Sequence, residues 1–168
     1  MKKLIFSIVL MILPVIASAQ MRFGYFSFNA VMKSMPEYVK AQQSIEQLRA
    51  KYDEEMKRAE QEFNAKYEDF LEVQHDLVPT ILRKRQTELQ DIMEKNIAFK
   101  ADAQRLLRQA EVDALAPVKS KLVEAVEKVG RRQGYAFVIN TDGDTCPFVN
   151  PEMGEDATEQ ILVGLGIK

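Results

Sequence analysis

The chain has no tryptophan, one histidine and one cysteine among its 168 residues. One cysteine cannot form an intrachain disulfide, so the fold is not a small disulfide-stapled domain. Cys146 lies in the short apolar stretch 146–149, which favours a small buried side chain over a reactive thiol. His75 has no second histidine or cysteine nearby, so metal binding and nucleophilic catalysis lack their usual residues.

Glycine and proline are scarce, with seven and six residues. The sequence has no glycine-rich loop of the Walker type, the phosphate-binding element of many ATPases. Asp142 and Asp144 lack the further acidic ligands of a calcium loop, and residues 141–145 are predicted to form a plain turn. The sequence therefore indicates no catalytic, metal or cofactor site, and we do not expect an enzyme.

Positive charge is not in excess, because the chain has 23 basic residues and 25 acidic ones. Without a positive field, neither nucleic acid nor an anionic membrane is the expected partner. The apolar run 4–16 is shorter than the roughly 20 residues that a membrane-spanning helix needs. No stable membrane anchor is therefore predicted.

The N-terminus has the pattern of a secretory signal peptide, residues 1–19. Lys2 and Lys3 precede the apolar run, and the small residues 17–19 follow it, so we expect cleavage after Ala19. Gln20 stands where a lipid-anchored product would need cysteine. The mature chain loses two lysines and has a net charge of −4.

Two long helices dominate the centre of the chain. Residues 37–73 contain no glycine or proline and are rich in Glu, Lys, Gln, Ala and Arg, which predicts one uninterrupted helix. Pro79 disfavours helix just before it, so the hairpin tip is placed at 74–80. A second helix is predicted over 80–132, with a kink at Pro117 where arm meets body.

Each helix carries an apolar stripe that repeats every 11 residues, a period that gives a nearly straight rod. Matching periods allow the helices to lie antiparallel, forming an arm over residues 37–132. The seam is expected to contain Ile45, Leu48, Tyr52, Met56, Ala59, Phe63, Tyr67, Phe70, Leu89, Ile92, Phe99, Ala103, Leu107, Ala110, Ala114, Val118, Leu122, Ala125 and Val129.

The two chain ends are predicted to form a small β-containing body from residues 20–36 and 133–168. Strands are expected at 22–28, at 135–140 with burial on both faces, and at 146–149. A terminal helix is expected over 156–163, and Gly134 is expected to end the second long helix. The fold class is α+β, with the arm protruding from the body. Because so small a body leaves apolar strand edges, we expect copies to associate through it.

Apolar side chains outside the seam have two interpretations. They are ordinary surface residues of an amphipathic hairpin, or they give weak contacts to an unfolded polypeptide. The candidates are Leu71, Val73, Leu77, Val78, Ile81 and Ile97. The basic patch Arg83, Lys84 and Arg85 near the tip is either a second contact or a solvated face, since Glu88 and Asp91 follow it.

The chain resembles the Skp/OmpH family of periplasmic chaperones along its whole length. The resemblance lies in residues 23–28, 35–38, 134–139, 155–158 and 165–167, together with the charged hairpin. It implies a periplasmic homotrimer whose body joins helical arms around a cavity that holds unfolded outer-membrane proteins without ATP. The best-known members are strongly basic, whereas this chain is net acidic, so no lipopolysaccharide site is carried over.

These observations favour a holdase chaperone with client contacts on the arm. The alternative is a structural coiled-coil adaptor that docks on a folded cell-envelope partner. An adaptor should carry a contiguous apolar outer stripe, whereas a holdase should carry scattered contacts.

Overall fold

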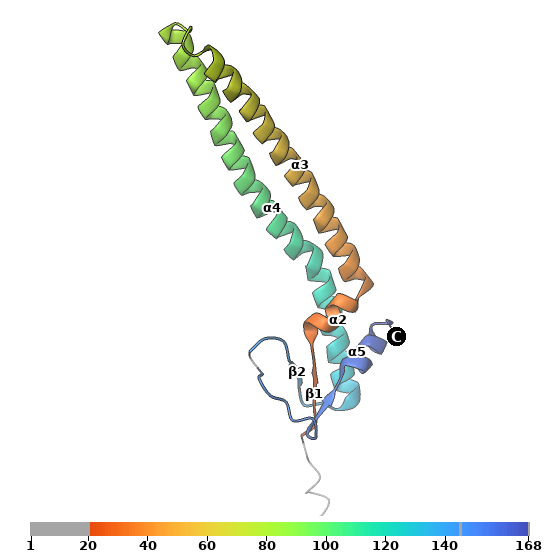
Figure 1. Cartoon of the computed structure of the whole chain (residues 1–168). Coiled ribbons are helices and arrows are strands. Elements are labelled where there is room, and N and C mark those ends of the chain that lie inside the picture. The colour runs from red at the N-terminus through yellow and green to blue at the C-terminus, as the bar shows by residue number, and fades with distance from the viewer. Residues whose placement is uncertain (1–20, 145, 168) are drawn as a thin grey trace, which may run out of the picture. The chain divides into compact units, whose positions relative to one another are not determined.

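A computed structural model describes residues 21–144 and 146–167. The described chain is mostly helical, with two long helices and a small three-stranded sheet (Figure 1). It divides into two compact units: the arm, Pro36–Val118, and the body, formed by the residues before and after it. The predicted signal peptide, residues 1–19, lies outside the described residues. The α+β class, with a long helical hairpin and a small β-containing body, is confirmed.

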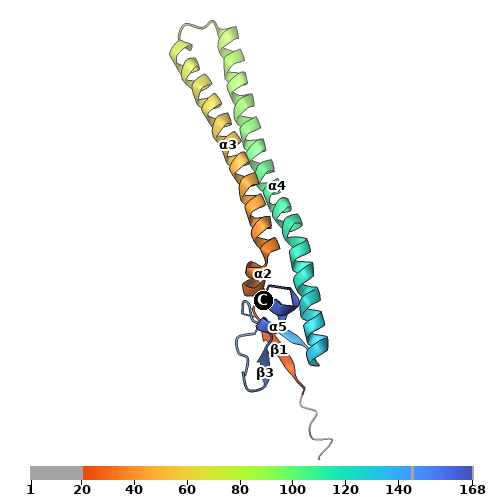
Figure 2. The ribbon, with the colours of Figure 1, turned by 90° about the vertical axis from the view of Figure 1, so that its right-hand side faces the viewer.

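The arm consists of α3 (Pro36–Val73) and the part of α4 (Pro79–Gln133) that ends at Val118. The two helices lie antiparallel and side by side in both ribbon views (Figures 1 and 2). Residues 74–78 form the turn between them, inside the predicted tip. Pro36 and Pro79 occupy first helical positions, where a missing N–H costs no helical hydrogen bond.

The predicted seam is buried or half-buried along both helices, with one exception. Ile45 and Ala103 are fully buried, at 5% and 1% exposure. Tyr67 was predicted to lie in the seam but is 45% exposed. Its ring stacks on Phe63 with the centroids 5.9 Å apart, which lets the ring cover apolar surface while its hydroxyl stays near water.

Helix α4 is continuous through Pro117, and the kink predicted there stays a prediction. The predicted stop at Gly134 is confirmed, because this residue has a φ of 68°. The N–H of Gly134 donates to the carbonyl of Arg131, and the N–H of Tyr135 donates to that of Gly130. This is a Schellman motif, in which glycine adopts the left-handed conformation at no steric cost.

The body contains a parallel sheet with β1 (Phe23–Phe26) in its centre. β2 (Val138–Asn140) and β3 (Gly154–Asp156) flank it on either side. Two short helices, α2 (Phe28–Ser34) and α5 (Thr158–Gly164), complete the unit. The core of the body contains its largest fully buried side chains, which come from α2 and its C-cap, from α4 and from α5: Val31, Met35, Leu122 and Ile161.

One strand prediction was wrong in the body. Residues 146–149 form no strand, because Pro147 has no N–H for a ladder bond. The third strand is β3 instead, although Gly, Glu and Asp are poor strand formers. Gly154 is required by tight packing, since a Cβ there would collide with the ring of Phe23.

The strand predicted over 135–140 is shorter and less buried than expected. Only β2 is extended, and it lies at the edge of the sheet with a half-buried face. Phe137, just before it, is 47% exposed and stacks on Phe23. The first strand is also shorter than predicted, because Ser27 caps α2 by accepting from the N–H of Ala30 at 3.0 Å.

Arg22 links the start of β1 to β3 and to Tyr135. Its guanidinium lies 2.9 Å from Glu155 and 5.7 Å from the ring centroid of Tyr135. Burial, and then the nearby Glu155 carboxylate, raise the pKa of Tyr135 to about 12. The phenol therefore remains protonated at physiological pH.

Asp142, in the predicted turn after β2, ties this loop to the start of α2. Its carboxylate accepts from the Ser27 hydroxyl at 2.6 Å and from the N–H of Asn29 at 2.7 Å. These hydrogen bonds, that of Ser27 first, lower the pKa of Asp142. They join segments that are more than 100 residues apart in sequence.

We predict that Asp142→Asn lowers the thermal stability of the body at neutral pH. A carboxyl with a lowered folded-state pKa stabilises the fold above its unfolded pKa of about 3.9 and loses this effect as pH falls through the folded value. The deficit of the variant should therefore shrink on acidification. Thermal unfolding followed by circular dichroism, at several pH values and one protein concentration, measures the difference in melting temperature between the variant and the wild type. Asp144→Asn, at an exposed neighbour, is the control; an equal deficit in both variants contradicts the prediction.

Candidate functional site

No group of three or more His, Cys, Asp or Glu side chains is arranged for a metal ion in residues 21–144 and 146–167. His75 is exposed in the tip turn. Cys146 was expected to be buried but is half-buried, because its loop forms no strand that would enclose it. Within the described chain no helix has the length and apolar character of a membrane span. The apolar and basic residues that the sequence singled out all lie on the arm, and this surface is the candidate site.

The six apolar candidates fall into two places. Five lie at the tip, in the end of α3, the turn and the first turn of α4, and four of these are exposed: Leu71, Val73, Val78 and Ile81. The fifth, Leu77, is half-buried. Ile97 is 63% exposed and lies farther along α4, roughly 24 Å from Ile81 at the helical rise per residue.

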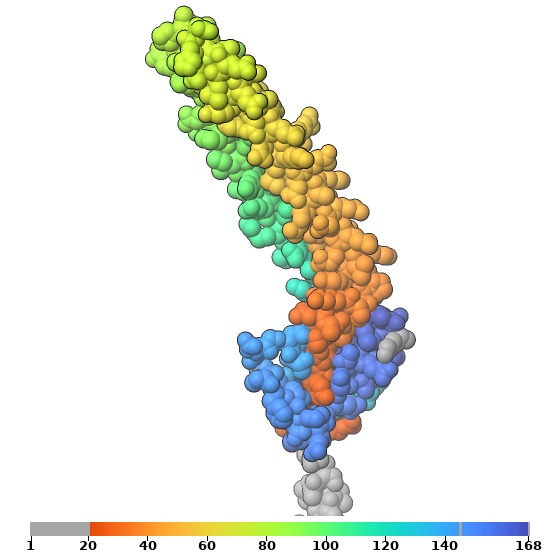
Figure 3. Space-filling view, in the orientation of Figure 1, coloured from red at the N-terminus to blue at the C-terminus, as the bar shows by residue number. Residues whose placement is uncertain are grey.

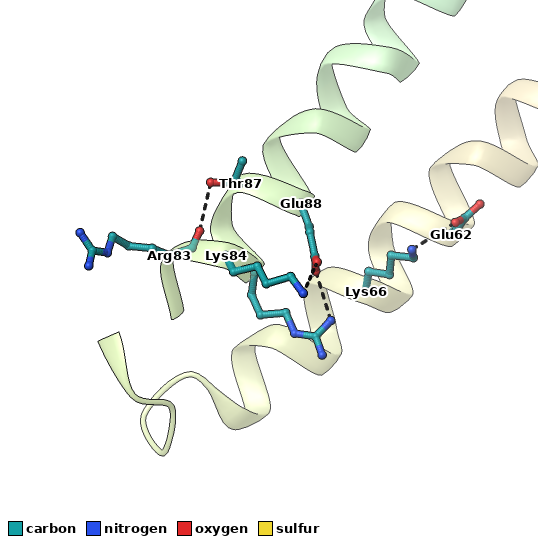
Figure 4. Close-up of polar contacts among 7 residues, drawn as sticks. Glu62, Lys66, Arg83, Lys84, Thr87 and Glu88 are labelled. Carbon is teal, nitrogen blue, oxygen red and sulfur yellow. Dashed lines mark hydrogen bonds and ion pairs between the residues drawn. The ribbon is translucent and has the colours of Figure 1, made fainter. Parts of the chain in front are cut away.

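The basic patch is partly compensated by its own helix. Lys84 lies 3.7 Å and Arg85 lies 3.2 Å from the carboxylate of Glu88. In Figure 4 the side chain of Arg83 points away from this carboxylate, while its carbonyl accepts from the Thr87 hydroxyl at 3.1 Å. Among the described residues, Arg83 is thus the member of the patch without an ion pair.

The seam of the arm contains an aromatic contact and a polar one. The rings of Tyr52 and Phe99 are 6.1 Å apart and tilted. The half-buried amide of Asn96 donates across the seam to the carbonyl of Ala59 at 3.2 Å. Since few partners suit an amide in an apolar seam, this hydrogen bond favours one alignment of the two helices.

Two grooves of about 470 Å³ each lie between α3 and α4. The first, here called the ionic groove, has six charged residues among its ten: Lys66, Asp69, Phe70, Val73, Arg85, Glu88, Leu89, Asp91, Ile92 and Lys95. The second, here called the methionine groove, has four charged residues among its eleven. These eleven are Asp53, Met56, Lys57, Ala59, Glu60, Phe63, Met93, Asn96, Ile97, Phe99 and Lys100.

The grooves open on opposite sides of the seam. At 3.6 residues per turn, Met93 and Ile97 lie on one side of the seam residue Ile92, whereas Asp91 and Lys95 lie on the other. The space-filling view shows one side of the arm, with α3 in yellow and orange beside α4 in green (Figure 3). Of the predicted candidates, Ile97 lines the methionine groove and Val73 and Arg85 line the ionic groove.

The sequence did not single out Met93, which is 46% exposed in the methionine groove. Its spacing of four from Ile97 was the available signal, because residues four apart share a helix face.

A family model described as outer membrane protein (OmpH-like) matches residues 22–165, which covers the body and the arm. No curated protein sequence matches the chain.

We predict that Asn96→Ala destabilises the arm relative to Asn64→Ala. Both changes gain helix propensity, but only the first removes a hydrogen bond across the seam. The free energy of unfolding of Asn96→Ala should therefore be about 1 kcal/mol lower than that of Asn64→Ala. Urea unfolding followed by helical circular dichroism measures the difference, and equal stabilities would refute the role of Asn96.

Proposed function

Because the chain belongs to the OmpH-like family of outer membrane proteins, we propose that it is an ATP-independent periplasmic holdase. Its clients are unfolded outer-membrane proteins, held in a cavity between helical arms. The family is one of periplasmic chaperones for such proteins. The observation that carries the proposal is a hairpin arm that exposes separate apolar side chains on otherwise charged helices.

The exposed apolar side chains suit many weak contacts. They lie in separate places along the charged arm, so each place gives only a small part of the binding energy. Several such contacts on one client act together through their high effective concentration. We propose that the contacts include Leu71, Val73, Leu77, Val78, Ile81 and Ile97.

The basic patch plays a smaller part in this proposal than it does in a strongly basic arm. Glu88 compensates Lys84 and Arg85, and exposed ion pairs of this kind are screened by salt. Arg83 is the member that remains available for an acidic segment of a client.

The predicted signal peptide supports the periplasm as the compartment of this function. The residues that form the predicted signal, 1–19, would be removed after Ala19, leaving a chain that begins at Gln20. The family match begins at residue 22, just after this point.

We propose that the protein is a homotrimer that assembles through the body. Both outer strands of the sheet, β2 and β3, have one edge unpaired within the described chain, and such edges favour association. The body also exposes large apolar side chains, Phe137, Phe148 and Met153. Association would cover this surface and bring several arms around one space.

A coiled-coil adaptor is the alternative function. An adaptor needs a contiguous apolar stripe on the outside of the arm, because a helix of the partner would dock there and bury this stripe. The exposed apolar residues of the arm instead fall in separate places, namely the tip, the methionine groove and single positions such as Val39, Leu106 and Val112. This distribution favours the holdase.

We predict that the mature protein slows the aggregation of a urea-unfolded outer-membrane β-barrel protein after dilution. One trimer per client should suffice, since the cavity holds the client, and ATP should have no effect. Turbidity against time measures the rate. An unrelated antiparallel coiled coil at equal mass is the control. The proposal fails if aggregation runs at the control rate, and a native pull-down that captures one folded envelope protein would favour the adaptor.

We also predict that light scattering gives three times the mass of one chain, and that Phe137→Ser weakens this assembly. Val39→Ser is the matched control, because Val39 on the arm is equally exposed, at 47%. The first variant should dissociate at higher concentrations than wild type, whereas the second should not. A monomeric wild-type protein, or equal dissociation of both variants, contradicts trimerisation through the body.

A further inference from the structure

The methionine groove has an apolar floor beside the seam. Met56, Phe63 and Phe99 are half-buried there, and Met93 and Ile97 form an exposed wall. Methionine side chains are flexible and polarisable, so such a wall adapts to apolar groups of different shape. The groove therefore offers apolar contact without demanding one particular shape.

We propose that the methionine groove receives bulky apolar side chains from an unfolded segment of low net charge, and that the ionic groove on the opposite side does not. The proposal rests on the holdase function and names the face of the arm and the kind of segment that it binds. It goes beyond the tip contacts, because it selects one side of each hairpin.

Charge on the rim argues for an uncharged occupant. Two acids, Asp53 and Glu60, and two lysines, Lys57 and Lys100, line the methionine groove. None of the four forms an ion pair with another described residue. Their charges cancel, so the rim favours neither a positive nor a negative occupant. Their carboxylate and ammonium groups remain available to hydrogen-bond the backbone of an extended segment.

The ionic groove differs in how much of its lining is charged, with six of its ten residues against four of eleven in the methionine groove. Its Glu88 pairs with Lys84 and Arg85, and its Lys66 lies 3.4 Å from Glu62. An apolar side chain that entered this groove would remove water from these charges without replacing their hydration, which costs free energy. The two grooves have equal volume, so chemistry rather than space separates them.

Size argues against a folded partner or a second copy as the occupant. Eleven residues line the groove, whereas a stable protein interface uses roughly 20 to 30 residues on each side. A volume of about 470 Å³ falls within the range of roughly 300 to 1,000 Å³ that encloses a small ligand. It suits two or three side chains of one extended segment.

We predict that the double variant Met93→Gln/Ile97→Gln binds an unfolded β-barrel client about tenfold more weakly, because two apolar contacts are lost. Asp91→Gln/Lys95→Gln is the matched control on the same helix: it alters the ionic groove, and both double variants leave the net charge unchanged. Fluorescence anisotropy of a labelled client gives the affinities. Circular dichroism checks that each variant folds. Wild-type affinity for an apolar, uncharged client peptide should also hold up to about 0.5 M NaCl, where surface charges are screened.

A second measurement does not depend on weakening the groove. In a Cys146→Ser background, Ile97→Cys and Asp91→Cys are each labelled with a polarity-sensitive fluorophore or a benzophenone crosslinker. Client addition should shift the emission to the blue and give client crosslinks at position 97, but not at 91. Equal signals at both positions, or crosslinks at 97 to another copy of the chain, overturn the proposal.

The outcomes separate this proposal from the proposed function. If the wild-type protein does not slow client aggregation, the holdase function fails. If it does, while Met93→Gln/Ile97→Gln binds as tightly as wild type, the holdase stands and the groove proposal alone is overturned.

Discussion

The apolar seam between α3 and α4 is the contact on which the arm depends. The ion pairs on its outer faces join residues three or four positions apart on one helix and are exposed, so each contributes only a few tenths of a kcal/mol. A helix within a protein gains most of its stability from the packing of its apolar face. The 11-residue period keeps each stripe facing the other helix over the whole length of the arm.

A seam of two helices cannot be filled as a domain core is. Each helix has one partner, so most seam side chains remain half-buried, and spaces open where large and small side chains meet. The chain lines these spaces differently on the two sides, with ion pairs on one and methionines on the other. Grooves on the arm thus arise from incomplete packing, and in our proposal one of them serves as a binding surface.

The sequence predicted the parts of the fold that local chemistry determines. The absence of glycine and proline, the 11-residue stripe, Pro79 and Gly134 define the hairpin and its ends. The sheet was harder, because pairing with β1 decides which residues are extended. Nothing local marks Gly154–Asp156 as a strand, and the fit of Gly154 against Phe23 is visible only in three dimensions. In the candidate site Ile97 was predicted, but Met93 was not. A groove can open on either side of the apolar stripe of α4, and the packing of α3 against α4 decides which side it is.

The apolar stripe of helix α4 keeps the same spacing in the arm and in the body, where its surroundings differ. Within the arm its stripe meets a single helix, and Phe99, Leu107 and Ala110 are only half-buried. Within the body the same spacing continues into Leu122 and Val129, which are almost fully buried, and here α4 also meets other elements, since Val129 lies against Gly164 of α5 and Gly130 against Val138 of β2. The residue types hardly differ between the two stretches, so the number of packing partners sets how much apolar surface remains. In the proposed function, the arm offers a client the apolar contacts that its own fold leaves unused, whereas the core of the body covers the same stripe.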